Sequence, residues 1–142
     1  MRTRIIGILV AVAGIGAVGL GTSGIVKAPH LAALHLAREL QRGATFDMCA
    51  WQHRWVWWSV VLVIIGAAIS ISGAAISIRR PWGYLLFALI MGLAATSSWV
   101  QKLCGLVQYR YEEPNIWESL VYVALCLIAL RSYRVSSRRL GA

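Results

Sequence analysis

Charged residues are scarce in this chain of 142 residues: Asp, Glu, Lys and Arg make up 13% of it, whereas hydrophobic residues make up 59%. Soluble domains average about 25% charged and about 45–50% apolar residues, so this composition excludes an ordinary soluble domain. Acidic residues are the scarcest, at five against 14 basic ones, which gives a net charge of +9. The basic residues lie at the ends of apolar runs and not along one amphipathic face, so lipid headgroups are favoured over nucleic acid as their partner.

Cysteine is also sparse, with three residues and no CxxC pair, which excludes a zinc ribbon and the usual dithiol redox motif. Cys49 and Cys104 are both predicted on the outer side of the membrane, where a disulfide is permitted. A hairpin that turns near residue 80 puts Cys49 about 10 Å beyond the level of Cys104. Bridged Cα atoms lie within about 7 Å, so a bridge requires the chain before Trp55 to fold back. Cys126 is predicted to be a small apolar filler.

The apolar runs contain almost no ionisable side chains. Proton-coupled pumps and transporters usually carry Asp, Glu, His or Arg within the membrane, so this absence argues against that class. Glu118 is the single carboxylate near a run, and it is expected in a first helical turn as the capping-box partner of Asn115. The chain therefore lacks the residues of an intramembrane relay or catalytic centre.

Four long apolar runs dominate what is present, at about residues 5–26, 55–78, 82–102 and 116–131. The first is longer than the apolar segment of about 7–15 residues in a signal peptide, which makes a cleaved signal the alternative to an uncleaved span. Pro29 suits the first position of a separate amphipathic helix over about 29–42. The predicted fold is all-α, a single-domain integral membrane bundle of four antiparallel transmembrane helices with this interfacial helix between helices 1 and 2.

Arginines flank the predicted inner ends of the runs. With both termini inside, eight basic residues fall on the inner side and six on the outer side, while all five acidic residues fall outside. This distribution predicts a protein of the bacterial inner membrane with cytoplasmic N- and C-termini. The basic tail after Leu130 is expected to be loose.

Small residues recur every seven positions in the first two runs. The positions are Gly7, Gly14 and Gly21, and then Ser59, Gly66 and Gly73, while Gly92 lies in the third run. Small side chains let two membrane helices approach closely, so these positions are predicted to pack against other helices. The GxGxxG pattern at 14–19 lacks a preceding strand and therefore does not indicate a dinucleotide site.

Tryptophan gathers in the stretch DMCAWQHRWVWW at 47–58, which holds four of the seven tryptophans of the chain. Tryptophan rings settle at the level of lipid headgroups. The sequence therefore predicts an interfacial anchor. Its members are Trp51, Trp55, Trp57 and Trp58, together with Trp99 and Trp117 near other run ends.

Cys49 and His53, four residues apart in the same stretch, are the candidates for chemistry. They begin a metal site with Asp47 nearby, or pair a thiol with a base, but either use needs further groups that the sequence does not identify. His30 and His35 lie about 140° apart around a helix and cannot share one metal from it.

The sequence thus favours a non-catalytic membrane protein without a cofactor, such as a subunit, assembly factor or protective partner of a larger complex. Its expected partners are the lipid bilayer and another membrane protein or a second copy of the chain, with small-residue faces as the docking surfaces. The alternatives are a redox or metal-handling protein that uses Cys49 and His53, and a self-associating pore.

Overall fold

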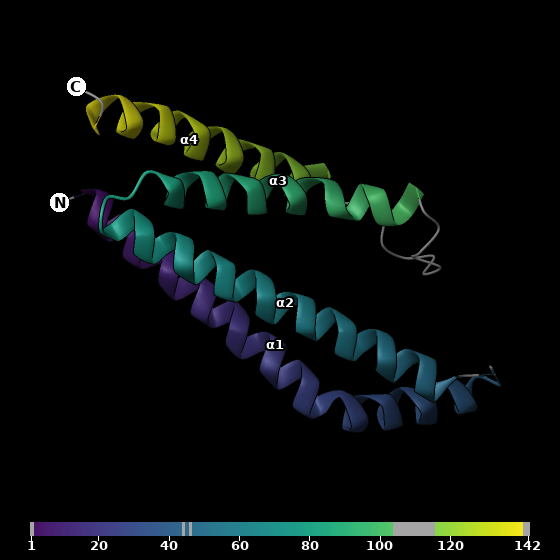
Figure 1. The fold of residues 1–142 in the computed structure, drawn as a ribbon. Helices are drawn as coiled ribbons and strands as arrows, with labels where there is room; N and C mark the ends of the chain where they lie inside the picture. Colours follow the sequence, from purple (N-terminus) through teal and green to yellow (C-terminus); the bar gives the residue numbers. More distant parts are fainter. Residues whose placement is uncertain (1, 44, 46, 104–115, 141–142) are drawn as a thin grey trace. The chain divides into compact units, whose positions relative to one another are not determined.

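The computed structural model describes residues 2–43, 45, 47–103 and 116–140. Within these ranges the chain forms four helices and no strand, as Figure 1 shows. The helices are α1 (Arg2–Gln41), α2 (Met48–Ser77), α3 (Trp82–Leu103) and α4 (Ile116–Leu140). The prediction of an all-α chain is therefore confirmed for the described residues.

Contacts divide the chain into two units. Unit 1 comprises Met1–Ala11 and Ala68–Ala142, and so contains the start of α1, the end of α2, and all of α3 and α4. Unit 2 is Val12–Ala67, the remainder of α1 and α2 with the loop between them.

Among the described residues, three helices are long and apolar enough to cross a membrane, and their candidate segments are Thr3–Gln41, Met48–Ser77 and Ile116–Arg138. The described apolar part of α3, Trp82–Ser97, is shorter. The 22 residues of α3 rise about 33 Å at 1.5 Å per residue, close to the thickness of a bilayer core.

α1 does not stop before Pro29, so the predicted separate helix over 29–42 is wrong: this segment is the last part of α1. A proline inside a helix leaves one carbonyl, here that of Ile25, without its helical partner and costs about 3 kcal/mol. Ala28 and Ala32, on either side of the proline, are fully buried, so packing holds both flanking turns. α1 bends in its C-terminal part (Figure 1), as expected for a helix that contains proline.

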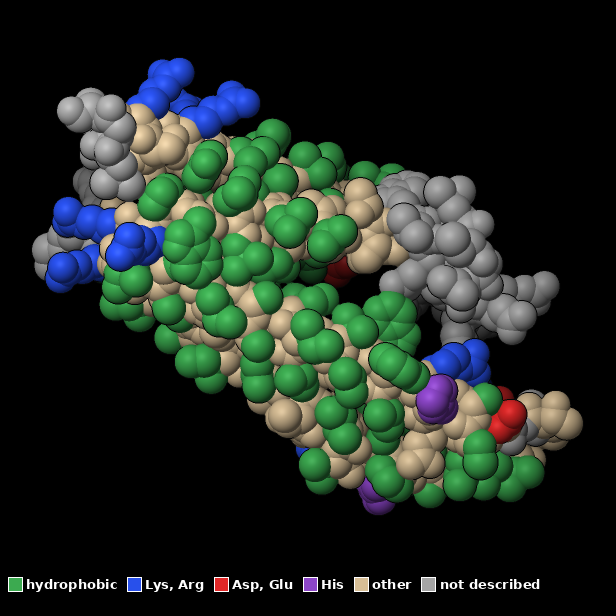
Figure 2. Space-filling view, in the orientation of Figure 1, with side chains coloured by type: hydrophobic (Ala, Val, Ile, Leu, Met, Phe, Trp, Pro, Cys, Tyr) green, Lys and Arg blue, Asp and Glu red, His purple; other side chains and the backbone are tan. Residues whose placement is uncertain are grey.

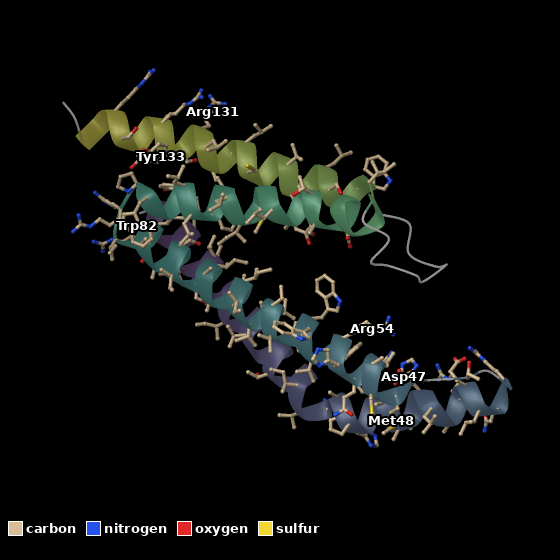
Figure 3. The ribbon with its side chains drawn as sticks, turned by 45° about the vertical axis from the view of Figure 1, so that its right-hand side comes forward. Asp47, Met48, Arg54, Trp82, Arg131 and Tyr133 are labelled. Carbon is tan, nitrogen blue, oxygen red and sulfur yellow. The ribbon has the colours of Figure 1, made fainter. Side chains whose placement is uncertain are left out.

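Asp47 determines where α2 begins. Its Oδ1 accepts a hydrogen bond from the backbone N–H of Ala50 at 3.0 Å, and its carbonyl accepts one from Trp51 at 3.1 Å. This is the geometry of a helix N-cap. The helix therefore starts at Met48, next to Asp47 in Figure 3, seven residues before the predicted start of the second membrane span at Trp55.

Arg79 ends α2 in a left-handed conformation, with φ of 62°. Its N–H donates to the carbonyl of Ile76 at 3.0 Å, and the N–H of Arg80 donates to Ala75 at 2.8 Å. These two bonds form a Schellman motif, in which glycine usually occupies the position of Arg79. Pro81 follows directly, so the chain turns sharply before α3 begins.

Gly83 brings the start of α3 close to the end of α2 inside unit 1. A Cβ at this position would lie 2.8 Å from the carbonyl oxygen of Ser72 and 2.9 Å from the amide nitrogen of Ile76. Ser72 and Ile76 are the largest fully buried side chains of the described structure. The backbones of α2 and α3 are thus in direct contact at this point of the core of unit 1.

α4 continues through most of the basic tail that was expected to be loose, and ends at Leu140. Arginine is a good helix former, and positive charge in a last helical turn is favourable beside the free carbonyl groups. Glu118 lies in the first turn, as predicted, but its expected partner Asn115 lies outside the described residues. Trp82 and Tyr133 lie at the same end of unit 1, where Arg131 points away from α3 (Figure 3).

Candidate functional site

In unit 2, glycines bring α1 and α2 into backbone contact. A Cβ at Gly66 would lie 2.8 Å from the carbonyl oxygen of Gly14. One at Gly21 would lie 2.7 Å from the carbonyl oxygen of Ser59. The contacts move toward the start of α2 as α1 advances, so the two segments run in opposite directions. These glycines serve packing within the chain and leave no room for a side chain.

Unit 1 repeats this arrangement between the start of α1 and the end of α2. A Cβ at Gly7 would meet the backbone of Ser77 and the carbonyl oxygen of Gly73, the latter at 2.7 Å. The hydroxyl of Ser70 donates to the carbonyl of Ala11 at 3.3 Å and adds a bond between the helices. Here too the small residues pack against another helix of the same chain.

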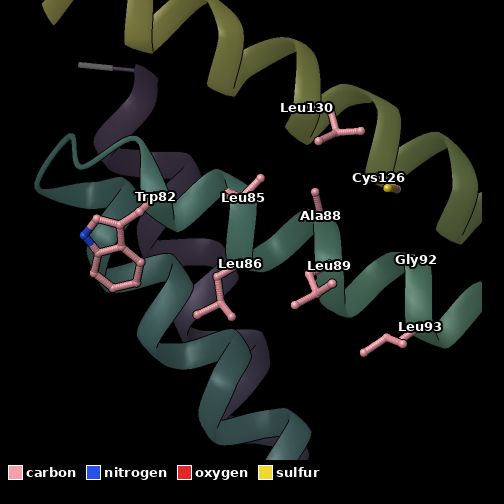
Figure 4. Close-up of a pocket in the computed structure, with 9 residues that line it drawn as sticks. All are labelled: Trp82, Leu85, Leu86, Ala88, Leu89, Gly92, Leu93, Cys126 and Leu130. Carbon is pink, nitrogen blue, oxygen red and sulfur yellow. The ribbon is translucent and has the colours of Figure 1, made fainter.

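The pair of α3 and α4 is different, because a groove of about 670 Å³ remains on it. Figure 4 shows its lining residues, most of them from α3, with Cys126 and Leu130 from α4. They are Trp82, Leu85, Leu86, Ala88, Leu89, Gly92, Leu93, Cys126 and Leu130. The cysteine thiol is the only titratable group among them, so the groove suits an apolar occupant.

Gly92 belongs to this groove. A Cβ there would meet only the Sγ of Cys126, at 3.9 Å, among the described neighbours. Leu89 and Leu93 beside it are 60% and 62% exposed. Unlike Gly66 or Gly73, Gly92 has no backbone atom of another described helix within 4 Å of its Cβ position. Gly16 and Gly19 on α1 likewise have no such atom within 4 Å in the described part of the chain.

Part of the tryptophan stretch is packed inside unit 2. Trp51 is 9% exposed and lies between His35, at a ring separation of 4.8 Å, and Trp55, stacked at 5.2 Å. The Nε1–H of Trp55 donates to the carbonyl of Gly24 on α1 at 3.1 Å. Trp51 and Trp55 therefore join α2 to α1, a role that their spacing in the sequence did not reveal.

Three other tryptophans of the predicted anchor have exposed side chains. Trp57 is 58% exposed, Trp58 is 54% exposed and Trp117 is 77% exposed. The side chain of Trp99 lies outside the described residues.

His53 is held by its own helix, because its Nε2 accepts a hydrogen bond from the Nε1–H of Trp57 at 2.8 Å. This bond occupies the lone pair that a metal or a substrate proton would need at that nitrogen. The carboxylate of Asp47 is engaged in capping α2. The described residues hold no group of three or more His, Cys, Asp or Glu that could bind a metal ion.

Cys49 is exposed and unpaired in the structure. Its predicted disulfide partner, Cys104, lies outside the described residues. Cys126, half-buried and unpaired, lines the groove on α4.

No family model, curated protein or solved structure matches this chain. Gly92 was predicted from the sequence as a helix-packing position, but the groove around it was not. The available signal was the spacing of Ala88 and Gly92, two small residues one turn apart on a helix of large apolar ones.

Proposed function

We propose that this is a non-catalytic integral membrane protein that docks a transmembrane helix of a partner membrane protein in the α3–α4 groove. In this proposal the four helices cross the bilayer as an antiparallel bundle with both termini in the cytoplasm. The open, apolar groove with Gly92 at its surface is the observation that carries it.

Large apolar side chains on the helix surfaces support the membrane setting. Figure 2 shows hydrophobic side chains over much of the visible surface of unit 1, with Lys and Arg gathered at one end. A soluble protein rarely exposes a contiguous apolar patch larger than a few hundred Å². The basic end contains the α2–α3 turn and the end of α4, which is the distribution of a cytoplasmic side under the positive-inside rule.

A helix suits the groove better than a flexible acyl chain. Ala88 and Gly92 form a small-xxx-small pair on α3 and both line the groove, where Ala88 is 3% exposed and Gly92 is half-buried. Such pairs permit close backbone contact between membrane helices, where van der Waals packing replaces the hydrophobic drive. A glycine in a helix interior costs about 1 kcal/mol relative to alanine. A flexible acyl chain can pack against ordinary side chains. Binding an acyl chain would therefore not explain a glycine that destabilises the helix.

Site-specific photo-crosslinking in native membranes tests the proposal. A photoreactive residue at Leu89, in the groove, should yield a discrete protein adduct, and Gly92→Leu in the same chain should abolish it. The same probe at Leu127, which is 61% exposed on α4 and does not line the groove, serves as the control position. An adduct of twice the mass of the chain would show that the helix in the groove belongs to a second copy of this protein and not to a different partner. Lipid adducts alone at Leu89 would refute docking.

A further inference from the structure

A second cavity lies in unit 1, where the start of α1 meets the end of α2. Its volume is about 490 Å³, within the range of about 300–1,000 Å³ that ligand sites occupy. Arg4 and Ile8 line it from α1, Ser77 from α2, and Ile78 and Arg79 from the turn that follows. None of these residues lines the α3–α4 groove.

The two arginines that line this cavity form no ion pair with a carboxylate in the described structure. The one ion pair in the described ranges joins Arg42 and Glu39, in unit 2. Glu118 is the only acidic residue described in unit 1, and it lies in the first turn of α4, away from the basic end. Two like charges lining one cavity favour an anion between them.

The available donors match an oxyanion. A guanidinium offers paired N–H groups that fit two oxygens of a phosphate. The hydroxyl of Ser77 already donates to the carbonyl of Ala74 at 2.7 Å, so the donors of the site are Arg4 and Arg79.

Arg79 occupies its position against a conformational preference. Its φ of 62° is in the left-handed region, which typically costs a non-glycine residue about 1–3 kcal/mol. Glycine would complete the same Schellman motif without this cost. Arginine at this position supplies a positively charged side chain beside the cavity, which glycine would not.

The remaining wall favours a lipid over a free anion. Ile8 is 55% exposed and Ile78 is 68% exposed, so apolar surface continues from the cavity along the helices. A free phosphate ion makes no favourable contact with apolar surface, whereas the acyl chains of a phospholipid can pack against it. Basic side chains near the cytoplasmic face of a membrane protein attract anionic lipids in particular.

We infer that the Arg4–Arg79 cavity binds the phosphate group of an anionic phospholipid from the inner leaflet. The inference rests on the membrane setting of the proposed function but not on its groove. Its phosphate, with one negative charge, accepts hydrogen bonds from both guanidiniums and offsets part of their charge. The bound lipid thereby joins the start of α1 to the end of α2.

Native mass spectrometry of the full chain in detergent tests this site. Phosphatidylglycerol or phosphatidylcholine is titrated into the micelles, and the fraction of protein that retains one lipid is measured. Arg4→Gln with Arg79→Gln should weaken retention of phosphatidylglycerol about tenfold or more, the loss expected for charge-assisted hydrogen bonds. Arg134→Gln with Arg138→Gln, an equal change of charge on α4, should leave retention within about twofold, because neither residue lines the cavity.

Three outcomes would overturn the inference. Equal weakening by both pairs would indicate diffuse attraction, equal retention of phosphatidylcholine would show that the lipid charge is irrelevant, and displacement by inorganic phosphate would identify a free-anion site. Should the glutamine pair lose helix content by circular dichroism, Arg4→Lys with Arg79→Lys replaces it and should still weaken retention, since lysine lacks the paired donors. Gly92→Leu should retain the lipid as the wild type does, which separates this test from that of helix docking.

Discussion

The α1–α2 contacts and the α3–α4 pair both contain glycine, but they use it in opposite ways. In both units, a Cβ on Gly7, Gly21, Gly66 or Gly73 would come within 2.8 Å of backbone atoms across the contact. On α3, a Cβ at Gly92 would meet one sulfur atom at 3.9 Å. The α1–α2 glycines are covered by backbone within the chain, whereas the α3–α4 pair leaves an apolar groove beside its glycine.

This difference shows that a small residue in a membrane helix does not by itself identify the contact it serves. What matters is whether a helix of the same chain packs against the glycine, as at Gly66, or leaves its neighbourhood open, as at Gly92. The following substitutions test that distinction.

Gly66→Leu should have the largest effect. The new side chain would force the α1 and α2 backbones apart, because Gly14 O and Val18 N both lie 2.8 Å from the Cβ position. Overpacking of this kind costs roughly 1–3 kcal/mol. Thermal unfolding in detergent measures the loss. Gly16→Leu, on an open face of α1, is the matched control, and equal stability of the two variants would contradict the contact.

Asp47→Ala should come next, because the side chain of Asp47 caps the helix that carries one side of the contact. Loss of an N-cap costs about 1 kcal/mol. Denaturant titration of the full chain should show this loss, and Asp47→Asn should restore most of it through its side-chain oxygen. If Ala and Asn are equally destabilising, the carboxylate acts through its charge and not as a cap.

Trp55→Phe should have a smaller effect, since it removes only the hydrogen bond to Gly24 and keeps an aromatic ring against Trp51. Hydrogen bonds between membrane helices are worth about 0.6 kcal/mol on average. Trp57→Phe is the control, because the Trp57 bond stays within α2. The comparison fails if Trp57→Phe destabilises the chain more than Trp55→Phe does.

Gly92→Leu should change stability least, by less than about 0.5 kcal/mol, because the only described atom near the Cβ position is the Sγ of Cys126 at 3.9 Å, an ordinary van der Waals distance. The same variant should lose the photo-crosslink from Leu89. A large loss of stability would show that the α3–α4 groove is closed in the membrane and would remove the basis of helix docking.

Much of the fold could be predicted because apolar runs of membrane-crossing length are a strong signal. The run at 82–102 lies within one residue of α3, and the run at 116–131 starts where α4 starts. The errors came at ends and junctions. Pro29 was expected to begin a helix but lies inside one, because buried alanines on both sides offset the missing bond. α2 begins at Met48 because Asp47 caps it, and a single capping residue is a weak pattern in sequence.

By itself, the sequence determined the helical, apolar character of the chain, the recurrence of small residues and the segregation of arginines, since composition and periodicity carry these properties. Only the tertiary structure decided which glycines meet a backbone, that Trp51 is buried against His35, and that Arg4 lines a cavity with Arg79. These relations join residues far apart in the chain. They depend on which helix faces pack together, and the heptad spacing of small residues is the same whether the facing helix belongs to the chain or to a partner.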